Sequence, residues 1–226
     1  MRKKAELVLM LLLIGGLLLA GKNLGEYVSS DQVESKDRKV VIDPGHGGRD
    51  PGKIGVNQVL EKDINLKIAK KVRDRLEEKG ISVTMTREKD ETLAPEESSN
   101  KQVEDIKKRV EIIDQTAPAL AVSIHQNSYH SSDVRGAQVF YYQHSKEGEK
   151  AAAVMQEALA AVDPENARDA KANDTYYLLR RTESPTIIVE CGFLSNPEEA
   201  DKLKTEEYQE ELADAIAEGI ETCLAG

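Results

Sequence analysis

Hydrophobic residues follow two different periods along this chain, and the two alternate. Short apolar or alternating runs, which are typical of strands, occupy residues 39–43, 81–87, 120–125, 136–143 and 185–190, and residues 176–180 predict a further strand. Apolar residues recur on one helical face over residues 60–79, 100–115 and 146–162, and Asn196-Pro197 begins a helical stretch that reaches Leu224. Strands and helices therefore alternate from residue 39 onward.

This alternation predicts an α/β fold. Strands separated by helices pair in parallel, so we expect a single domain with a mainly parallel, twisted sheet of about six strands and helices on both faces. A length of 226 residues fits one such domain with an extension. In these sheets, ligands bind beyond the carboxyl ends of the strands, which is where functional residues are expected.

The first 38 residues differ from the rest. A basic head, Arg2-Lys3-Lys4, precedes 14 uncharged residues, 7–20. This pattern indicates a secretory signal peptide or an N-terminal membrane anchor over residues 1–20, although an apolar run of this length is also compatible with a buried core helix. Residues 21–38 lack periodicity and are interpreted as a linker to a catalytic domain over residues 39–226. We expect export to the outer face of the membrane or the cell wall.

Composition narrows the function classes. The formal net charge is −10, which argues against nucleic-acid binding because such proteins usually carry a basic face. Two cysteines are too few for a disulfide scaffold, and Cys191, within an apolar segment, is interpreted as a small buried thiol. His130 and His144 lie in polar surroundings and are expected on the surface.

Potential metal ligands stand where three predicted strands end. His46 follows the first strand in a glycine-rich loop, His125 ends another strand, and Glu190 ends the last one. Glu61 begins the first long helix, which returns from the same edge of the sheet. Two imidazoles with one carboxylate, leaving a position open for water, form a catalytic zinc arrangement.

Each residue also has a purely structural interpretation. The loop around His46 could cradle a phosphate, although it lacks the Lys-Ser/Thr pair of such loops. His125 could be a core histidine, Glu61 a helix N-terminal acid, and Glu190 a partner in a buried ion pair. The coincidence of all four at one edge favours a functional site.

Four segments resemble the zinc-dependent N-acetylmuramoyl-L-alanine amidases (amidase type 3). They are VVIDPGHGGRDPG, LEKDINLKIA, SIHQN and IIVECGFLSNPEEA, and they span about residues 39–224. Two further segments, VRDRLEEKGISVTMTREKDETLAPE and KKRVEIID, are similar to the germination-specific, spore-cortex members of that family in endospore formers.

The resemblance implies roles for these residues. His46, Glu61 and His125 match the ligands of a single Zn²⁺, and Glu190 matches the catalytic glutamate. The implied reaction is hydrolysis of the amide between N-acetylmuramic acid and the first L-alanine of the peptidoglycan stem peptide. Glu190 then acts as the general base toward water and the general acid toward the leaving amine. In a spore former, the implied setting is formation of the cortex muramic lactam in the space between the two forespore membranes.

Two alternatives remain beside this interpretation. The same zinc chemistry could serve a peptidase that cuts within the stem peptide, and the products would distinguish the two enzymes. An inactive wall-binding module is the third hypothesis, against which the presence of all four site residues argues. The partners expected are peptidoglycan and a regulatory protein, with membrane contact only through the N-terminal segment. Asn127 and Gly136 are separated by only eight residues, too few for a helix that plugs the site.

Overall fold

Six strands form one sheet in the computed structural model, which describes residues 39–226. The strands are β1 (Lys39–Pro44), β2 (Ser82–Met85), β3 (Leu120–Asn127), β4 (Gln138–Tyr142), β5 (Lys171–Asn173) and β6 (Thr186–Phe193). Their order across the sheet is β2-β1-β3-β6-β4-β5. The first four in this order run parallel, whereas β4 is antiparallel to β6 and β5 is parallel to β4. The predicted α/β class and mainly parallel sheet are confirmed.

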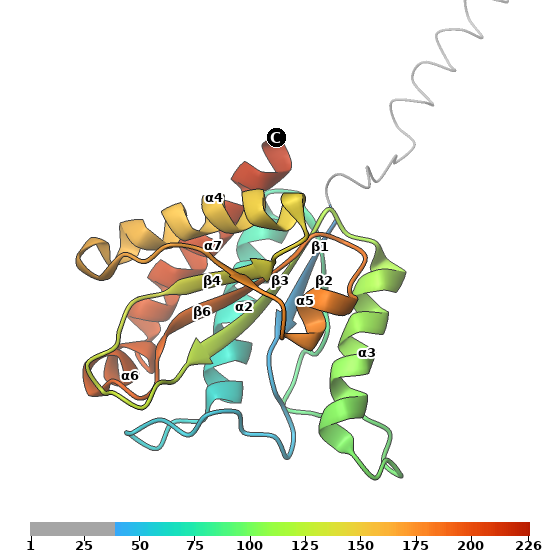
Figure 1. Ribbon diagram of the computed structural model, residues 1–226, viewed down its shortest axis with the longest axis horizontal. Coiled ribbons are helices and arrows are strands. Elements are labelled where there is room, and N and C mark those ends of the chain that lie inside the picture. The colour runs from blue at the N-terminus through green and yellow to red at the C-terminus, as the bar shows by residue number, and fades with distance from the viewer. Residues whose placement is uncertain (1–38) are drawn as a thin grey trace, which may run out of the picture. The chain divides into compact units, whose positions relative to one another are not determined.

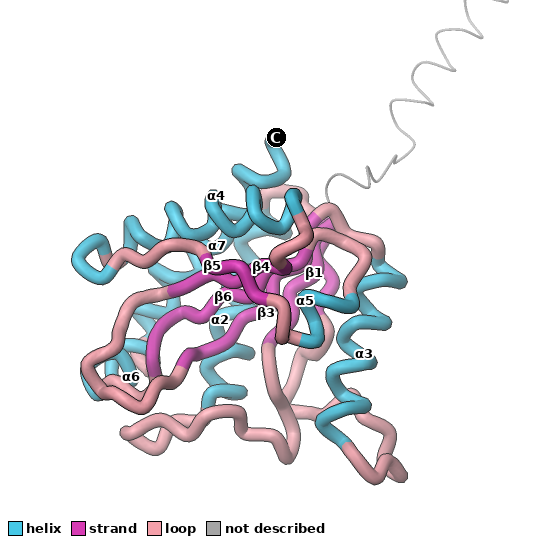
Figure 2. The backbone as a smooth tube through the Cα atoms, in the orientation of Figure 1, coloured by secondary structure: helices cyan, strands magenta, loops and turns pink. Residues whose placement is uncertain are grey.

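Helices cover both faces of this sheet (Figures 1 and 2). One face carries α2 (Glu61–Glu78), α4 (Lys146–Val162) and α7 (Glu206–Ala225), and the other carries α3 (Lys101–Thr116) and α5 (Tyr177–Arg181). Alternation along β1 explains the two layers, since Val40 and Ile42 join the core under α2 while Val41 packs against α3 and α5. Short helices η2 (Pro164–Asn166) and α6 (Pro197–Leu203) lie in the connections.

The predicted strand over residues 176–180 is wrong, because this segment is the short helix α5. The Asn173 side-chain oxygen accepts hydrogen bonds from the backbone amides of Thr175 and Tyr176, at 2.7 and 2.8 Å, and so turns the chain into the helix. The sixth strand is instead β5, whose Lys-Ala-Asn sequence shows no apolar alternation because it pairs with only one neighbour at the sheet edge.

The predicted C-terminal helical stretch is two helices, α6 and α7. The Thr205 hydroxyl accepts a hydrogen bond from the backbone amide of Tyr208 and caps α7, so the stretch breaks immediately before it. Residues 1–38, which include the predicted signal or anchor and the linker, lie outside the described residues. Among residues 39–226, no helix is both long and apolar enough to cross a membrane.

A buried ion pair fixes the carboxyl end of β1. The Asp43 carboxylate is 1% exposed and accepts hydrogen bonds of 2.6 Å from Arg109 on α3, from the Thr86 hydroxyl and from the Ser123 hydroxyl on β3. Arg109 also donates to the backbone carbonyls of Pro44 and His46, both at 2.7 Å. The loop that leaves β1 is therefore held at its first residues.

We predict that this contact makes stability depend on acidity. Burial raises the pKa of Asp43, but Arg109 and the two hydroxyl donors outweigh it and lower the pKa from 3.8 to about 2. The stabilisation is thus complete above the ordinary pKa and is lost as the pH falls through about 2. Between about pH 6 and pH 2, the unfolding free energy of the natural protein should fall by about 2 kcal/mol more than that of Asp43→Asn.

Urea unfolding of both proteins at several pH values measures this difference. The Asn variant is the matched control because it keeps the shape of the side chain and does not titrate. A gap between the two proteins that stays constant with pH would contradict the prediction.

Candidate metal centre and active site

Three potential metal ligands meet at the carboxyl ends of the strands. His46 lies in the loop after β1, Glu61 is the first residue of α2, and His125 lies in β3, and each offers a ligand atom within 4.8 Å of the others. Glu61 Oε1 lies 3.2 Å from His46 Nε2 and 2.9 Å from His125 Nδ1. The two imidazole rings meet edge to face, with centroids 4.9 Å apart. The structure therefore brings together the three residues predicted to bind metal.

The absence of a side chain at two glycines makes room for these ligands. A Cβ atom at Gly45 would lie 2.2 Å from the ring of His125, and one at Gly52 would lie 2.5 Å from Glu61 Oε2. Gly52 also has a φ of 65°, which disfavours other residues. His46 itself has a left-handed φ of 62°, uncommon outside glycine, and its carbonyl accepts a hydrogen bond from Arg109. The loop is shaped to aim the imidazole.

The Glu61 carboxylate is fixed by backbone donors as well as by the histidines. Its Oε2 accepts from the Lys53 amide at 2.7 Å, and its Oε1 accepts from the Gln126 amide at 3.1 Å. Burial raises the pKa of Glu61, but the two histidines hold it well below its usual range. Glu61 is therefore an ionised carboxylate, as a metal ligand must be.

His46 shows that the site stabilises positive charge. Burial lowers the pKa of His46, but hydrogen bonds and charge from Glu61 and Asp50 outweigh this and raise the pKa to about 9. Asp50 Oδ2 lies 2.9 Å from His46 Nδ1, and its other oxygen accepts from the Gly52 amide at 3.1 Å. Asp50 thus orients the ring so that Nε2 faces Glu61.

The donor set fits Zn²⁺. Two nitrogens and one carboxylate oxygen are a common catalytic zinc set. Tetrahedral ligands at about 2.0–2.1 Å from zinc lie about 3.3 Å from one another, by geometry. The 3.2 and 2.9 Å separations around Glu61 Oε1 are close to this value. A second-layer carboxylate on His46 completes a typical zinc environment.

Glu190 lies on the strand next to His125. The two residues are register partners across β3 and β6, and their side chains point to the same face of the sheet. Glu190 is 7% exposed, and its Oε2 has no hydrogen-bond partner among the described residues. Burial raises the pKa of Glu190 to about 7, against the opposing effect of His125. Such a carboxyl group can take up and release a proton near neutral pH.

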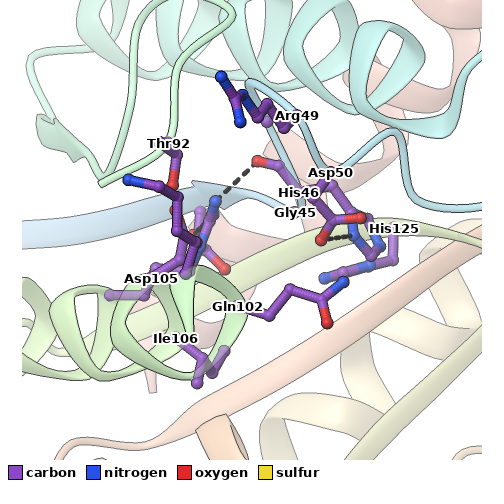
Figure 3. Close-up of a pocket in the computed structure, with 13 residues that line it drawn as sticks. Gly45, His46, Arg49, Asp50, Thr92, Gln102, Asp105, Ile106 and His125 are labelled. Carbon is purple, nitrogen blue, oxygen red and sulfur yellow. Dashed lines mark hydrogen bonds and ion pairs between the residues drawn. The ribbon is translucent and has the colours of Figure 1, made fainter. Parts of the chain in front are cut away.

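A cavity of about 340 Å³ opens beside the two imidazoles (Figure 3). It is bounded by the loop after β1 and by the first turns of α3, and Gln102 extends from α3 in the direction of His125. The lining residues are Asp43, Gly45, His46, Gly47, Arg49, Asp50, Thr92, Lys101, Gln102, Asp105, Ile106, Arg109 and His125. The cavity is placed to receive a substrate that reaches the potential metal ligands.

The expectations for other residues are also met. Cys191 is fully buried, and burial raises the pKa of its thiol strongly, while His130 and His144 are exposed.

Two residues near the site, Asp50 and Tyr176, were not predicted from the sequence. Asp50 was detectable as an acid four residues after His46. Tyr176 stands edge-on to Phe140, with ring centroids 5.5 Å apart, and burial together with the charges of Glu190 and Glu61 raises its pKa.

Comparison with known proteins defines the class of this site. Residues 40–222 match the family described as N-acetylmuramoyl-L-alanine amidase. The chain belongs to this family, since the match covers most of its length. It is an enzyme that hydrolyses the amide between N-acetylmuramic acid and L-alanine in peptidoglycan. This supports the amidase over the peptidase and the inactive wall-binding module.

Individual relatives agree with this assignment. The chain is 42% identical over 184 residues to the germination-specific N-acetylmuramoyl-L-alanine amidase of Bacillus subtilis, covering 80% of this chain and 77% of the relative. The solved CwlD amidase of Clostridioides difficile, in complex with the GerS lipoprotein, matches with a TM-score of 0.80 and 40% identity, covering 83% and 98% of the two chains. The amidase AmiC2 of Nostoc punctiforme matches with a TM-score of 0.73 and 34% identity, covering 84% and 98%.

Proposed function

We propose that this amidase binds one Zn²⁺ through His46, Glu61 and His125 and uses Glu190 as its general acid–base. The observation that supports this most directly is the meeting of both imidazoles at one oxygen of Glu61, beside a buried carboxyl group on the next strand. When bound, zinc would supply a Lewis acid that polarises the substrate carbonyl and acidifies water.

The protein's own residues provide the proton transfers. Glu190 takes a proton from the attacking water and then gives it to the nitrogen of L-alanine as the amide bond breaks. A pKa of about 7 suits both steps, because both protonation states of Glu190 are populated near neutral pH. Its low exposure limits competing exchange with bulk water. Asp50 contributes by keeping the His46 ring in one orientation.

Replacement of Glu190 by Gln tests the reaction. We expect turnover of purified peptidoglycan to fall by about two to four orders of magnitude, because the substitution preserves size and removes the base. Mass analysis of released fragments should show intact stem peptides that begin with L-alanine for the natural protein. Glu157→Gln, an exposed change on α4, is the matched control and should retain full activity. Near-normal turnover by Glu190→Gln would remove Glu190 from the mechanism.

Replacement of His125 by Ala tests the metal. We expect the purified domain to bind one zinc per chain and the variant to lose it, because two ligands seldom retain zinc in a catalytic site. His144→Ala changes an exposed histidine on the surface and should keep the metal. Zinc per chain is measured by mass spectrometry of the dialysed proteins. A full complement of zinc in His125→Ala would show that the ligand set is wrong.

The biological setting belongs to the proposal as well. Similarity to the germination-specific amidase of Bacillus subtilis supports a role in the spore cortex, where cleavage would free muramic acid for lactam formation. The complex of the similar CwlD amidase with the GerS lipoprotein supports control by a partner protein. Co-expression of the chain with lipoproteins of its own organism, followed by gel filtration, tests for such a partner. If no candidate lipoprotein elutes in the same peak as the chain, the proposal of a lipoprotein partner is contradicted.

Export places the enzyme with its substrate. We propose that residues 1–20 carry the domain out of the cytoplasm, as a signal peptide or an anchor, and that residues 21–38 link it to the catalytic domain at residues 39–226. A spore former whose only copy lacks residues 2–20 should make cortex without muramic lactam, and the full-length chain should restore it. Normal lactam in the truncated strain would contradict export. Normal lactam in a strain without the gene would contradict the cortex role.

A further inference from the structure

Besides the buried Arg109, two basic side chains line the cavity next to the two imidazoles. Arg49 comes from the loop after β1, three residues beyond His46, and Lys101 is the first residue of α3. The whole chain is strongly acidic, at −10, and anionic wall fragments are repelled by such a charge. Basic groups at the mouth of the active site therefore indicate a ligand that carries negative charge.

The acidic residues of the same cavity are already paired. Asp43 and Asp105 each accept a 2.6 Å hydrogen bond from the buried Arg109. Asp105 also accepts from the Thr92 hydroxyl, and Asp50 is occupied by His46. Although acids and bases are equal in number along this wall, the acidic groups are held by fixed partners inside the protein.

The basic residues retain free donors. Arg49 is exposed and makes no hydrogen bond or ion pair with any residue from 39 to 226, so all five guanidinium N–H groups are available. Lys101 donates to the backbone carbonyls of Pro95 and Glu96, at 3.0 and 2.6 Å, which leaves one of its three N–H groups and its full charge unused. What the cavity offers a ligand is positive charge with hydrogen-bond donors.

We propose that Arg49 and Lys101 form a subsite that binds a carboxylate of the stem peptide. This deepens the proposed function and rests on it, because the subsite assumes that the bond is cut at His46 and His125. The stem peptide supplies the nitrogen of the scissile amide. It carries carboxylates at its second residue and at its C-terminus. A guanidinium and an ammonium group are the donors that bind such a group most strongly.

Gln102 completes the subsite. Its side-chain amide makes no hydrogen bond with other residues of the described region, and the side chain extends from α3 in the direction of His125 (Figure 3). A free amide at this position can pair with a peptide group of the substrate between the reacting bond and the carboxylate. Binding at two separated points would fix the direction in which the stem peptide lies.

Arg49→Gln is the decisive variant. Because Arg49 makes no hydrogen bond or ion pair within residues 39–226, its replacement removes no polar contact and should leave the fold intact. Lys101→Gln is a second variant, with its unfolding midpoint measured because Lys101 holds two loop carbonyls. The matched control is Lys67→Gln, an exposed lysine on α2, which covers the opposite face of the sheet.

Three muramyl tetrapeptides with lysine at the third residue serve as substrates, so that the second residue and the C-terminus carry the only two carboxylates. One has both carboxylates free, one is amidated at the second residue, and one is amidated at the C-terminus. For the free substrate we expect Arg49→Gln to lower kcat/KM about five- to tenfold, and Lys67→Gln to leave it unchanged. The loss should vanish for whichever amidated substrate lacks the recognised carboxylate, which identifies its source. An equal loss on all three substrates, or no loss on any, would overturn the proposal.

Binding separates this proposal from the proposed function. Dissociation constants for the three tetrapeptides are measured by calorimetry on Glu190→Gln, with and without Arg49→Gln. The same carboxylate-dependent five- to tenfold weakening is expected. If the natural protein cuts none of the substrates but this weakening appears, the proposed reaction is wrong and the subsite stands. If cutting occurs and binding ignores the carboxylate, the subsite is wrong and the reaction stands.

Discussion

The site depends on one buried contact, the ion pair between Asp43 at the end of β1 and Arg109 on α3. Arg109 is 2% exposed and joins a side chain of the sheet to the carbonyls of Pro44 and His46. A second buried arginine, Arg87, donates to the carbonyls of Pro44, Gly45 and Lys62, at 2.9 to 3.0 Å. Without these two guanidinium groups, the Pro44 and His46 carbonyls would lose their arginine donors and the Gly45 carbonyl would keep only the 3.2 Å hydrogen bond from the Asn65 amide, and weakening the pairing of buried carbonyls is costly. The loop that carries His46 is ordered because these donors satisfy it.

The register between β3 and β6 positions His125 and Glu190, as the two arginines position the loop of His46. His125 faces Glu190 across the β3–β6 ladder, so the distance between a potential ligand and the acid–base candidate is set by backbone hydrogen bonds. A shift of one residue would turn one of these side chains to the opposite face, among the apolar residues under α2. Burial of Ile124 and Val189 on that face opposes such a shift. The hydrophobic core therefore fixes the chemistry at the edge of the sheet.

The difference between strand order and long-range side-chain contacts explains which features the sequence could predict. His46, His125 and Glu190 follow strong apolar strands, and parallel strands place their carboxyl ends together, so their meeting was predictable. Arg109 was not, because an arginine on an amphipathic helix is normally solvent-exposed, and only the tertiary fold shows that it turns inward. The helix α5 was mistaken for a strand since a few aromatic and aliphatic residues suit either structure. The turn made by the Asn173 side chain decides between them.

The lack of a hydrogen-bond or ion-pair partner for Arg49 within residues 39–226 is also a feature that only the tertiary fold shows. Sequence shows a basic residue in a glycine-rich loop, but the absence of a partner among residues 39–226 is visible only when every neighbouring acid has been accounted for. Pairing in a folded protein depends on which donors arrive from distant elements. Here α3 supplies Arg109 to two of the three acids and leaves Arg49 without one.

The burial of Cys191 has a consequence for the chemical durability of the enzyme. Oxidants and disulfides react with the thiolate, and a thiol with a strongly raised pKa and no exposed surface presents almost none of it. Strand β6 can therefore carry a sulfur atom directly beside Glu190 without exposing a reactive thiolate. Oxidation of the protein to sulfenic acid or mixed disulfides should begin at the half-buried Cys223, near the C-terminal end of α7, and leave β6 chemically unchanged.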